Sequence, residues 1–255
     1  MLNLIVALTA SVAGPAERPP IVTDRPDVAE SSLTVPAGTV QVETGVEFGS
    51  SSTDTADGTS FGLPTKLRIG VIENAEIHLE GTVFDRFTVD PGDLSASGLA
   101  DVEVGGKVHL LDPEGAVPSV GVLLALRVPI GADEVSGDIF VLRPTVTAEW
   151  DLMPALSFAA NVGLTVPLDD RELFTDGLRF AGSFGIHPES FPEGLGVFVE
   201  TFGEIPLGDG ENVLAADSGA TYLVNDDFQL DVYARVGLSD AAPDLAVGGG
   251  GSFRF

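Results

Sequence analysis

Apolar and polar side chains alternate along most of this chain, in short segments separated by Gly, Pro, Asp, Asn and Ser. In the clearest segment, residues 228–238, the even positions are apolar and the odd positions carry Gln229, Asp231, Tyr233 and Arg235. A period of two places successive side chains on opposite faces, as in a β-strand. The same rhythm predicts about twelve strands, each long enough to cross a bilayer at the usual tilt. The predicted strands are residues 40–48, 61–71, 75–87, 99–110, 120–130, 139–150, 156–168, 178–187, 195–205, 213–224, 228–238 and 245–255.

Charged residues are distributed unevenly between these strands and the segments that join them. The 255-residue chain has 39 acidic and 12 basic side chains, a net charge of −27. The connections hold 23 acids and one base, the residues before 40 hold four acids and two bases, and the strands hold twelve acids and nine bases. The strand charges lie on the face opposite the apolar side chains, where we also place Arg86, and Asp85 is the one exception. Each predicted strand therefore has an apolar face and a polar face, and the polar faces together are nearly balanced in charge.

The composition excludes several classes of protein and site. So acidic a chain is not a nucleic-acid binder, because phosphate contacts need clustered Lys and Arg. With no Cys, it has no disulfide framework, thiolate metal site or thiol nucleophile. Its three histidines, His78, His109 and His187, lie on different predicted strands without paired ligand spacing, so we expect lumen side chains and no metal site. No G-x-S-x-G motif is present, and we predict neither a catalytic residue nor a cofactor.

Strands with one charged and one apolar face fit two architectures. In a soluble barrel or sandwich the apolar face is the core and the charges meet water. In an outer-membrane barrel the apolar face meets lipid and the charges line the lumen. Twelve strands close into a barrel too wide for its own side chains to fill readily, and the terminal aromatic Phe255 resembles the assembly signal of bacterial outer-membrane proteins. We therefore predict an all-β fold, a transmembrane antiparallel up-and-down β-barrel of about 12 strands over residues 38–255.

Two segments precede the predicted barrel. Residues 1–16 are mostly apolar and then small, as in a secretory signal peptide without its basic n-region, so either the true start lies upstream or the match is partial. Residues 17–37 are predicted to be periplasmic and carry Asp24, Arg25 and Asp27 around a stiff proline. We hypothesise that this second segment folds back as a lumen plug, in which Arg25 pairs with lumen carboxylates. The alternative is a disordered periplasmic tail.

Several stretches of the chain resemble a known protein family. They are Thr-Asp-Arg-Pro-Asp at 23–27 with the run 34–45, Gly-Leu-Ala-Asp-Val-Glu-Val-Gly-Gly-Lys at 98–107, and residues 219–231 near the end. Over roughly residues 23–255 the chain is similar to the outer-membrane transporter family labelled "MetA-pathway of phenol degradation". The resemblance implies a bacterial outer-membrane β-barrel that passes small molecules, hydrophobic or aromatic ones among them. It assigns no binding residue.

The charged faces of the predicted strands supply the candidate lumen residues. These side chains form either a network of cross-strand ion pairs that narrows the lumen or a charged constriction that selects permeants by size and field, and the two are compatible. We also expect the four glycines at 248–251 to mark a bend or a close approach to the barrel wall. The candidate lumen-lining residues are Lys66, Arg68, Glu80, Glu103, Lys107, Arg127, Arg143, Glu149, Arg179, Glu200, Asp231 and Arg235.

Together these patterns predict a channel or transporter for small molecules in the bacterial outer membrane, with no cofactor and no enzymatic activity. Its expected partners are outer-membrane lipid, the outer-membrane assembly machinery acting on the C-terminal strand, and the small-molecule permeant. The main alternative is a secreted soluble β-barrel that binds a ligand in an apolar interior. A lipid-active outer-membrane enzyme is the third hypothesis.

Overall fold

The structure, a computed structural model, describes residues 18–53, 56–91, 94–168 and 177–255. The segment predicted to be a signal peptide, residues 1–16, lies outside the described residues. No helix in the described part is long and apolar enough to cross a membrane. Its strands are β1 (Val40–Ser52), β2 (Asp57–Ile72), β3 (Ala75–Asp90), β4 (Leu94–Gly98), β5 (Val102–Leu111), β6 (Ser119–Val128), β7 (Val141–Met153), β8 (Leu156–Pro167), β9 (Gly177–Ile186), β10 (Leu195–Pro206), β11 (Val213–Asn225), β12 (Phe228–Gly237) and β13 (Leu245–Arg254).

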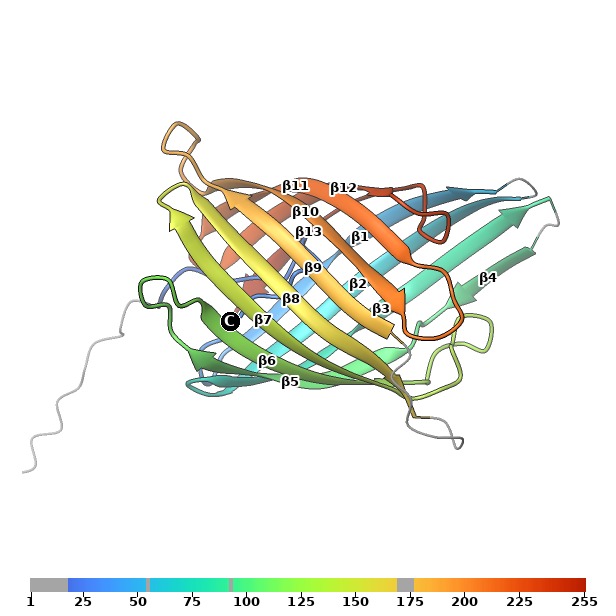
Figure 1. The fold of residues 1–255 in the computed structure, drawn as a ribbon, viewed down its shortest axis with the longest axis horizontal. Helices are drawn as coiled ribbons and strands as arrows, with labels where there is room; N and C mark the ends of the chain where they lie inside the picture. The colour runs from blue at the N-terminus through green and yellow to red at the C-terminus, as the bar shows by residue number, and fades with distance from the viewer. Residues whose placement is uncertain (1–17, 54–55, 92–93, 169–176) are drawn as a thin grey trace, which may run out of the picture.

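The strands form one closed antiparallel barrel (Figure 1). Apart from β4, each strand pairs with its neighbour in sequence, and β1 closes the ring by pairing with β13. Twelve strands of described residues make up the wall, because β4 pairs only with residues 85–89 of β3 while β5 pairs with residues 75–81. The predicted all-β, up-and-down barrel of about 12 strands is confirmed. We call the end that carries both termini of the barrel proximal, and the end with the β1–β2, β6–β7 and β10–β11 loops distal.

The first strands are longer than the sequence predicts. Residues 50–52 and 57–60, predicted as a connection, extend β1 and β2, with Ser50 opposite Thr59. The predicted connection 89–97 likewise contains β4. These stretches are rich in Ser, Thr and Gly, so they lack apolar alternation, yet their backbone groups complete the ladder of hydrogen bonds. The β1–β2–β3 side of the wall therefore extends farther at the distal end.

The strand predicted at 99–110 begins three residues late, because residues 99 and 101 bond to the β6–β7 loop instead of to β6. The carbonyl oxygen of Leu99 accepts from the N–H of Ala132 at 2.8 Å. The carboxylate of Asp101 accepts from the Ser136 hydroxyl at 2.6 Å. The β6–β7 loop is therefore fixed against the break between β4 and β5.

A β-bulge in β3 changes which face the following residues occupy. Gly62 pairs with Asp85, and the next recorded pair joins residues 64 and 82, so β3 carries one extra residue between the two pairs. Asp85 therefore lines the lumen, and Arg86 lies on the outer face opposite Phe61. The prediction that Arg86 faces the lumen is wrong, because alternation along one strand cannot reveal an extra residue that only strand pairing defines.

The wall is apolar outside and polar inside, the reverse of a soluble protein. On the outer face Val162, Val199 and Val232 are 54–59% exposed. On the inner face Arg68 and Lys107 are completely buried. An outward apolar band around a polar interior is the pattern of a transmembrane β-barrel.

Aromatic side chains pack together on the outer face near both ends of the barrel. The ring centroids of Phe48 and Phe61 are 4.9 Å apart at the distal end. Those of Trp150 and Phe158 are 5.8 Å apart near the proximal end. Aromatic residues at the two edges of an apolar band match the interfacial girdles of membrane barrels.

Candidate functional site

Residues 18–39 carry no regular secondary structure and run through the lumen; we call them the inner segment. They hydrogen-bond to side chains of ten strands, namely β1, β2, β3, β5, β6, β7, β9, β10, β12 and β13. Ser32 is completely buried and Val35 is 2% exposed. Only a segment inside the ring can contact strands on all sides, so the inner segment lies within the barrel.

A cluster of three lumen cations holds Asp24 of the inner segment. Its carboxylate lies 2.8 Å from Nζ of Lys107, 2.9 Å from Nζ of Lys66 and 3.2 Å from Nη1 of Arg68. Burial by itself would raise the pKa of Asp24, but attraction to these three cations outweighs it and holds the pKa well below its usual value. Glu30 also pairs with Lys66, at 2.6 Å, so the inner segment supplies two of the carboxylates that this cluster needs.

Lumen carboxylates also bind the backbone of the inner segment. Glu43 on β1 accepts from the N–H groups of residues 24 and 25 at 3.0 and 2.9 Å. Glu200 on β10 accepts from those of residues 28 and 29 at 2.7 and 2.6 Å. Glu76 on β3 and Glu149 on β7 accept from the N–H groups of residues 35 and 32. These charge-assisted bonds satisfy buried backbone donors that no secondary structure pairs, so an irregular segment can remain inside the barrel.

Arg25 and Asp27 tie the middle of the inner segment to the β9–β12 side of the wall. Nη2 of Arg25 donates to the carboxylate of Asp231 at 3.0 Å. The hydroxyl of Ser183 donates to the carboxylate of Asp27 at 2.8 Å. Burial raises the pKa of Asp27 to about 7, although the hydrogen bond from Ser183 opposes this rise. Among the described residues, Asp27 is therefore held by one neutral donor side chain, whereas Asp24 lies among three cations.

The glycine run at 248–251 lets the inner segment pack closely against the wall. A side chain at Gly250 would meet the guanidinium of Arg25 and the carbonyl oxygen of Thr44. A side chain at Gly248 would meet the ring of Tyr233. The close approach expected for residues 248–251 is thus present, since only glycine leaves room for these groups.

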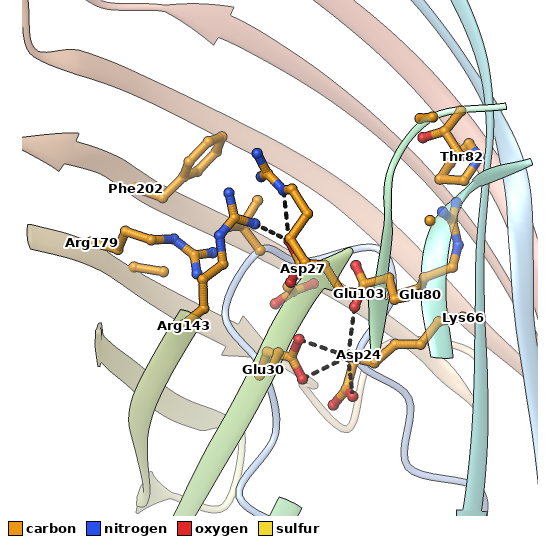
Figure 2. Close-up of a pocket in the computed structure, with 18 of the residues that line it drawn as sticks. Asp24, Asp27, Glu30, Lys66, Glu80, Thr82, Glu103, Arg143, Arg179 and Phe202 are labelled. Carbon is orange, nitrogen blue, oxygen red and sulfur yellow. Dashed lines mark hydrogen bonds and ion pairs between the residues drawn. The ribbon is translucent and has the colours of Figure 1, made fainter. Parts of the chain in front are cut away.

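The distal half of the lumen holds a cavity of about 960 Å³, which we call the distal cavity. Asp24 and Asp27 of the inner segment line it (Figure 2). Its lining also includes Arg25 and, from the β6–β7 loop, Ser136. Glu103 accepts from Arg143 on its wall. The lining is charged and polar, with apolar and aromatic side chains interspersed.

Arginines on four strands line this cavity, and their partners differ. Glu103 lies near both Arg127, at 3.5 Å, and Arg143. Arg235 pairs with Glu47 at 3.3 Å and with Asp217 on the adjacent strand. These contacts form the expected cross-strand ion pairs, and they narrow the lumen.

A smaller cavity of about 300 Å³, the proximal cavity, lies on the other side of the inner segment. Glu149 and His187 contribute to its wall. Arg25 and Asp27 line both cavities, so these two side chains form the partition between them.

The three histidines face the interior, on different parts of the wall. His78 lines the distal cavity and His187 the proximal one. His109 lies 3.2 Å from the carbonyl oxygen of Ser32. Within the described ranges, no group of three or more His, Cys, Asp or Glu side chains is placed to hold a metal ion.

All twelve sequence-predicted lumen residues point inward, in three groups. Lys66, Arg68 and Lys107 surround Asp24. Glu149, Glu200 and Asp231 bind the inner segment. The remaining residues line the distal cavity: Glu80, Glu103, Arg127, Arg143, Arg179 and Arg235.

Sequence reasoning missed the acceptors that bind the inner segment's backbone. Glu43 and Glu76 have inward parity, but nothing in their spacing indicates backbone N–H partners from residues 24–35. The loop contact of Asp101 was also missed, because it depends on the break between β4 and β5. The sequence does show more acids than bases on the strand faces, which indicates that some lumen carboxylates need partners other than strand cations.

Comparison with known proteins places the chain among barrel proteins. Residues 23–255 match the model of a protein family described as "Putative MetA-pathway of phenol degradation". No curated protein sequence matches the chain significantly.

Among solved structures, the fold is similar to that of two porins. The NanC porin aligns with a TM-score of 0.53 and 13% identity, over 84% of this chain and 98% of the porin chain. The KdgM porin aligns with a TM-score of 0.51 and 10% identity, over 85% of this chain and 99% of that chain. At such low identity the common feature is the fold alone.

Proposed function

Because this chain belongs to the phenol-degradation MetA-pathway family matched over residues 23–255, we propose that it is an outer-membrane channel that passes small molecules through its lumen. The observation that carries the proposal is a polar, hollow interior inside an apolar outer wall. Exposed Val162, Val199 and Val232 suit contact with lipid, whereas the charged lining of the distal cavity suits a hydrated path.

The path runs from the distal cavity, past the partition, to the proximal cavity. The partition consists of Arg25, bound to Asp231, and Asp27, bound to Ser183. In this proposal the inner segment restricts the pore, and a shift that breaks these two contacts joins the cavities. The stronger attachment through Asp24 lies nearer the β2–β5 wall, so the partition can move while that attachment persists.

The permeants are proposed to be small, aromatic or hydrophobic molecules, as the family label suggests. The interior argues against the alternative of a soluble ligand-binding barrel, because its most deeply buried large side chains include Arg68, Lys107, Glu43 and Glu200. A soluble barrel with an apolar site would instead bury its valines and leucines.

The first test is conductance of the purified protein in planar lipid bilayers. We expect discrete channels, a membrane-fraction location and gel mobility that shifts on heating. A protein that stays soluble without detergent, or a folded barrel with no conductance under any condition, would contradict the proposal.

The second test locks the partition. The chain has no Cys, so the double variant D27C/S183C would carry the only two thiols, at side chains now joined by a 2.8 Å hydrogen bond. We expect oxidation to lower conductance and a reductant to restore it. The single-cysteine variants are the controls and should not respond to the reductant.

A further inference from the structure

Arg179 on β9 is a lumen cation that is attracted to the carboxylate of Glu103 without a recorded contact to it. Within the described part of the chain it forms no recorded hydrogen bond or ion pair, although it lines the distal cavity. Its neighbour on β8 is Gly163, which has no side chain. Its neighbour on β10 is Glu204, whose carboxylate folds over Gly177, in the space that a side chain there would fill. The guanidinium is therefore left facing the cavity.

On the β6, β7 and β9 part of this wall, one carboxylate makes direct contact with the guanidinium groups. Arg143 on β7 and Arg127 on β6 share the single carboxylate of Glu103. The Nε atom of Arg143 is buried and has no hydrogen-bond partner. With Arg179 included, three arginines on this part of the wall have one directly bound carboxylate. An anion that enters the cavity here would accept hydrogen bonds from guanidinium N–H groups that have no acceptor.

An aromatic surface lies beside the free arginine. Phe202 on β10 is paired with Ala181 on β9, two residues from Arg179, and points into the distal cavity. Figure 2 shows Phe202, Arg143 and Arg179 on one side of the cavity, with Lys66 and Asp24 on the other. The guanidinium of Arg235 lies 4.9 Å from the Phe202 ring centroid. The ring thus lies beside arginine side chains.

We propose that Arg179 and Arg143, together with Phe202, bind the carboxylate and ring of a small aromatic acid. A planar carboxylate fits the two-pronged donor geometry of a guanidinium, and a ring can pack on Phe202 in an offset or edge-to-face arrangement. The inference rests on the proposed channel function and deepens it, since the site lies on the path.

The same contacts disfavour a neutral phenol as the preferred ligand. A phenolic hydroxyl loses its proton near pH 10, whereas a carboxylic acid is ionised above about pH 4. At pH 7 a phenol therefore brings no negative charge to Arg179. A benzoate ion brings both the charge and the ring.

Binding can be measured separately from conduction, by titration calorimetry on the protein in detergent micelles at pH 7. Benzoate, benzyl alcohol and sulfate are the three probes. We expect benzoate to bind about tenfold or more tightly than benzyl alcohol, because charge-assisted hydrogen bonds stabilise only the anion. Equal affinity for the two aromatics would overturn the proposal, and preferential sulfate binding would indicate a general anion site and overturn the aromatic part.

Substitutions test whether these residues bind benzoate. R179Q should weaken benzoate binding about tenfold or more and leave benzyl alcohol binding unchanged. E204Q should strengthen benzoate binding, because it removes the negative charge of the β10 residue that is paired with Arg179, and this charge repels the benzoate ion. The control R86Q alters an arginine on the outer face of the barrel, outside the lining of the cavity, and should change nothing. If R179Q alters neither affinity nor selectivity, the assignment is wrong.

Separate control measurements test whether each variant is folded and whether it conducts. Heat-modifiable gel mobility shows whether each variant is folded, and R179K retains the charge and should retain part of the benzoate affinity. A protein that conducts but does not prefer benzoate overturns this inference and leaves the channel function intact. A protein that binds benzoate through Arg179 but does not conduct overturns the channel function instead.

Discussion

Two aspartates three residues apart in the inner segment should respond in opposite ways to the same substitution. D24N removes the carboxylate charge that lies 2.8, 2.9 and 3.2 Å from three buried cations. Removing one partner of a buried ion pair costs about 3–5 kcal/mol, because the other charge is left uncompensated. We expect D24N to weaken docking of the inner segment by an amount of this order.

The size of the effect follows from the burial of the cluster. Glu30, Glu43 and Glu76 continue to pair with Lys66 and Arg68, so the lower end of the range, about 3 kcal/mol, is the better expectation. Each 1.4 kcal/mol is a factor of ten in an equilibrium constant. The undocked fraction should therefore rise by about two orders of magnitude.

D27N provides the matched control. The pKa of Asp27 is raised to about 7 by burial, so at pH 7.5 the docked segment holds a charge in an unfavourable environment. Asn removes that charge and can still accept from Ser183. Docking should become stronger in D27N than in the wild type.

Channel recordings and limited proteolysis can measure both variants. At pH 7.5 we expect higher open probability for D24N and lower for D27N than for wild type. A protease that cleaves after glutamate should cut after Glu30 faster in D24N and more slowly in D27N, in barrels shown to be folded by gel mobility. Equal effects of the two substitutions, or a lower open probability in D24N, would refute the electrostatic account of docking.

Three further outcomes are expected from the structure. Docking should take up a proton at Asp27, whose ordinary pKa of 3.8 rises to about 7. Docking should therefore weaken, and wild-type conductance should grow, as pH rises from about 4 to 7. A D27N channel that keeps this slope would exclude Asp27 as its source. G250A should lower the temperature of the gel-mobility shift, because the new methyl meets Arg25 and the Thr44 carbonyl oxygen, at a cost of about 1–3 kcal/mol. The control G208A adds a methyl into open space and should leave that temperature unchanged. R127Q should alter single-channel conductance and R86Q should not, because the bulge places Arg86 on the outer face; a conductance change in R86Q alone would contradict the register.

The alternation of residues along the chain predicted most of the barrel correctly. Each predicted strand from residue 120 onward matches an observed strand within one to three residues at its ends. A β-strand has a period of two that needs no distant partner, so local sequence suffices to identify it. The same parity also placed the twelve candidate lumen residues on the inner face.

The predictions of which way a side chain faces, and of where a strand begins, are wrong where pairing between strands determines them. The extra residue in β3 is visible only in its register with β2, which moves Arg86 to the outside and Asp85 to the inside. The break before β5 depends on Asp101 and Leu99 bonding to the β6–β7 loop. Neither feature changes the alternation of apolar and polar residues within a single segment.

The sequence alone therefore determined the number of strands, their two faces and the near balance of charge on the inner one. Which charges meet was decided by the tertiary structure. Closure of the ring brings Lys66, Arg68 and Lys107, from three strands, around Asp24. It leaves Arg179 without a hydrogen-bonded carboxylate among the described residues, because Glu204 folds toward Gly177. Side-chain parity is a local property of the backbone, whereas an ion pair depends on register and on a distance across the lumen.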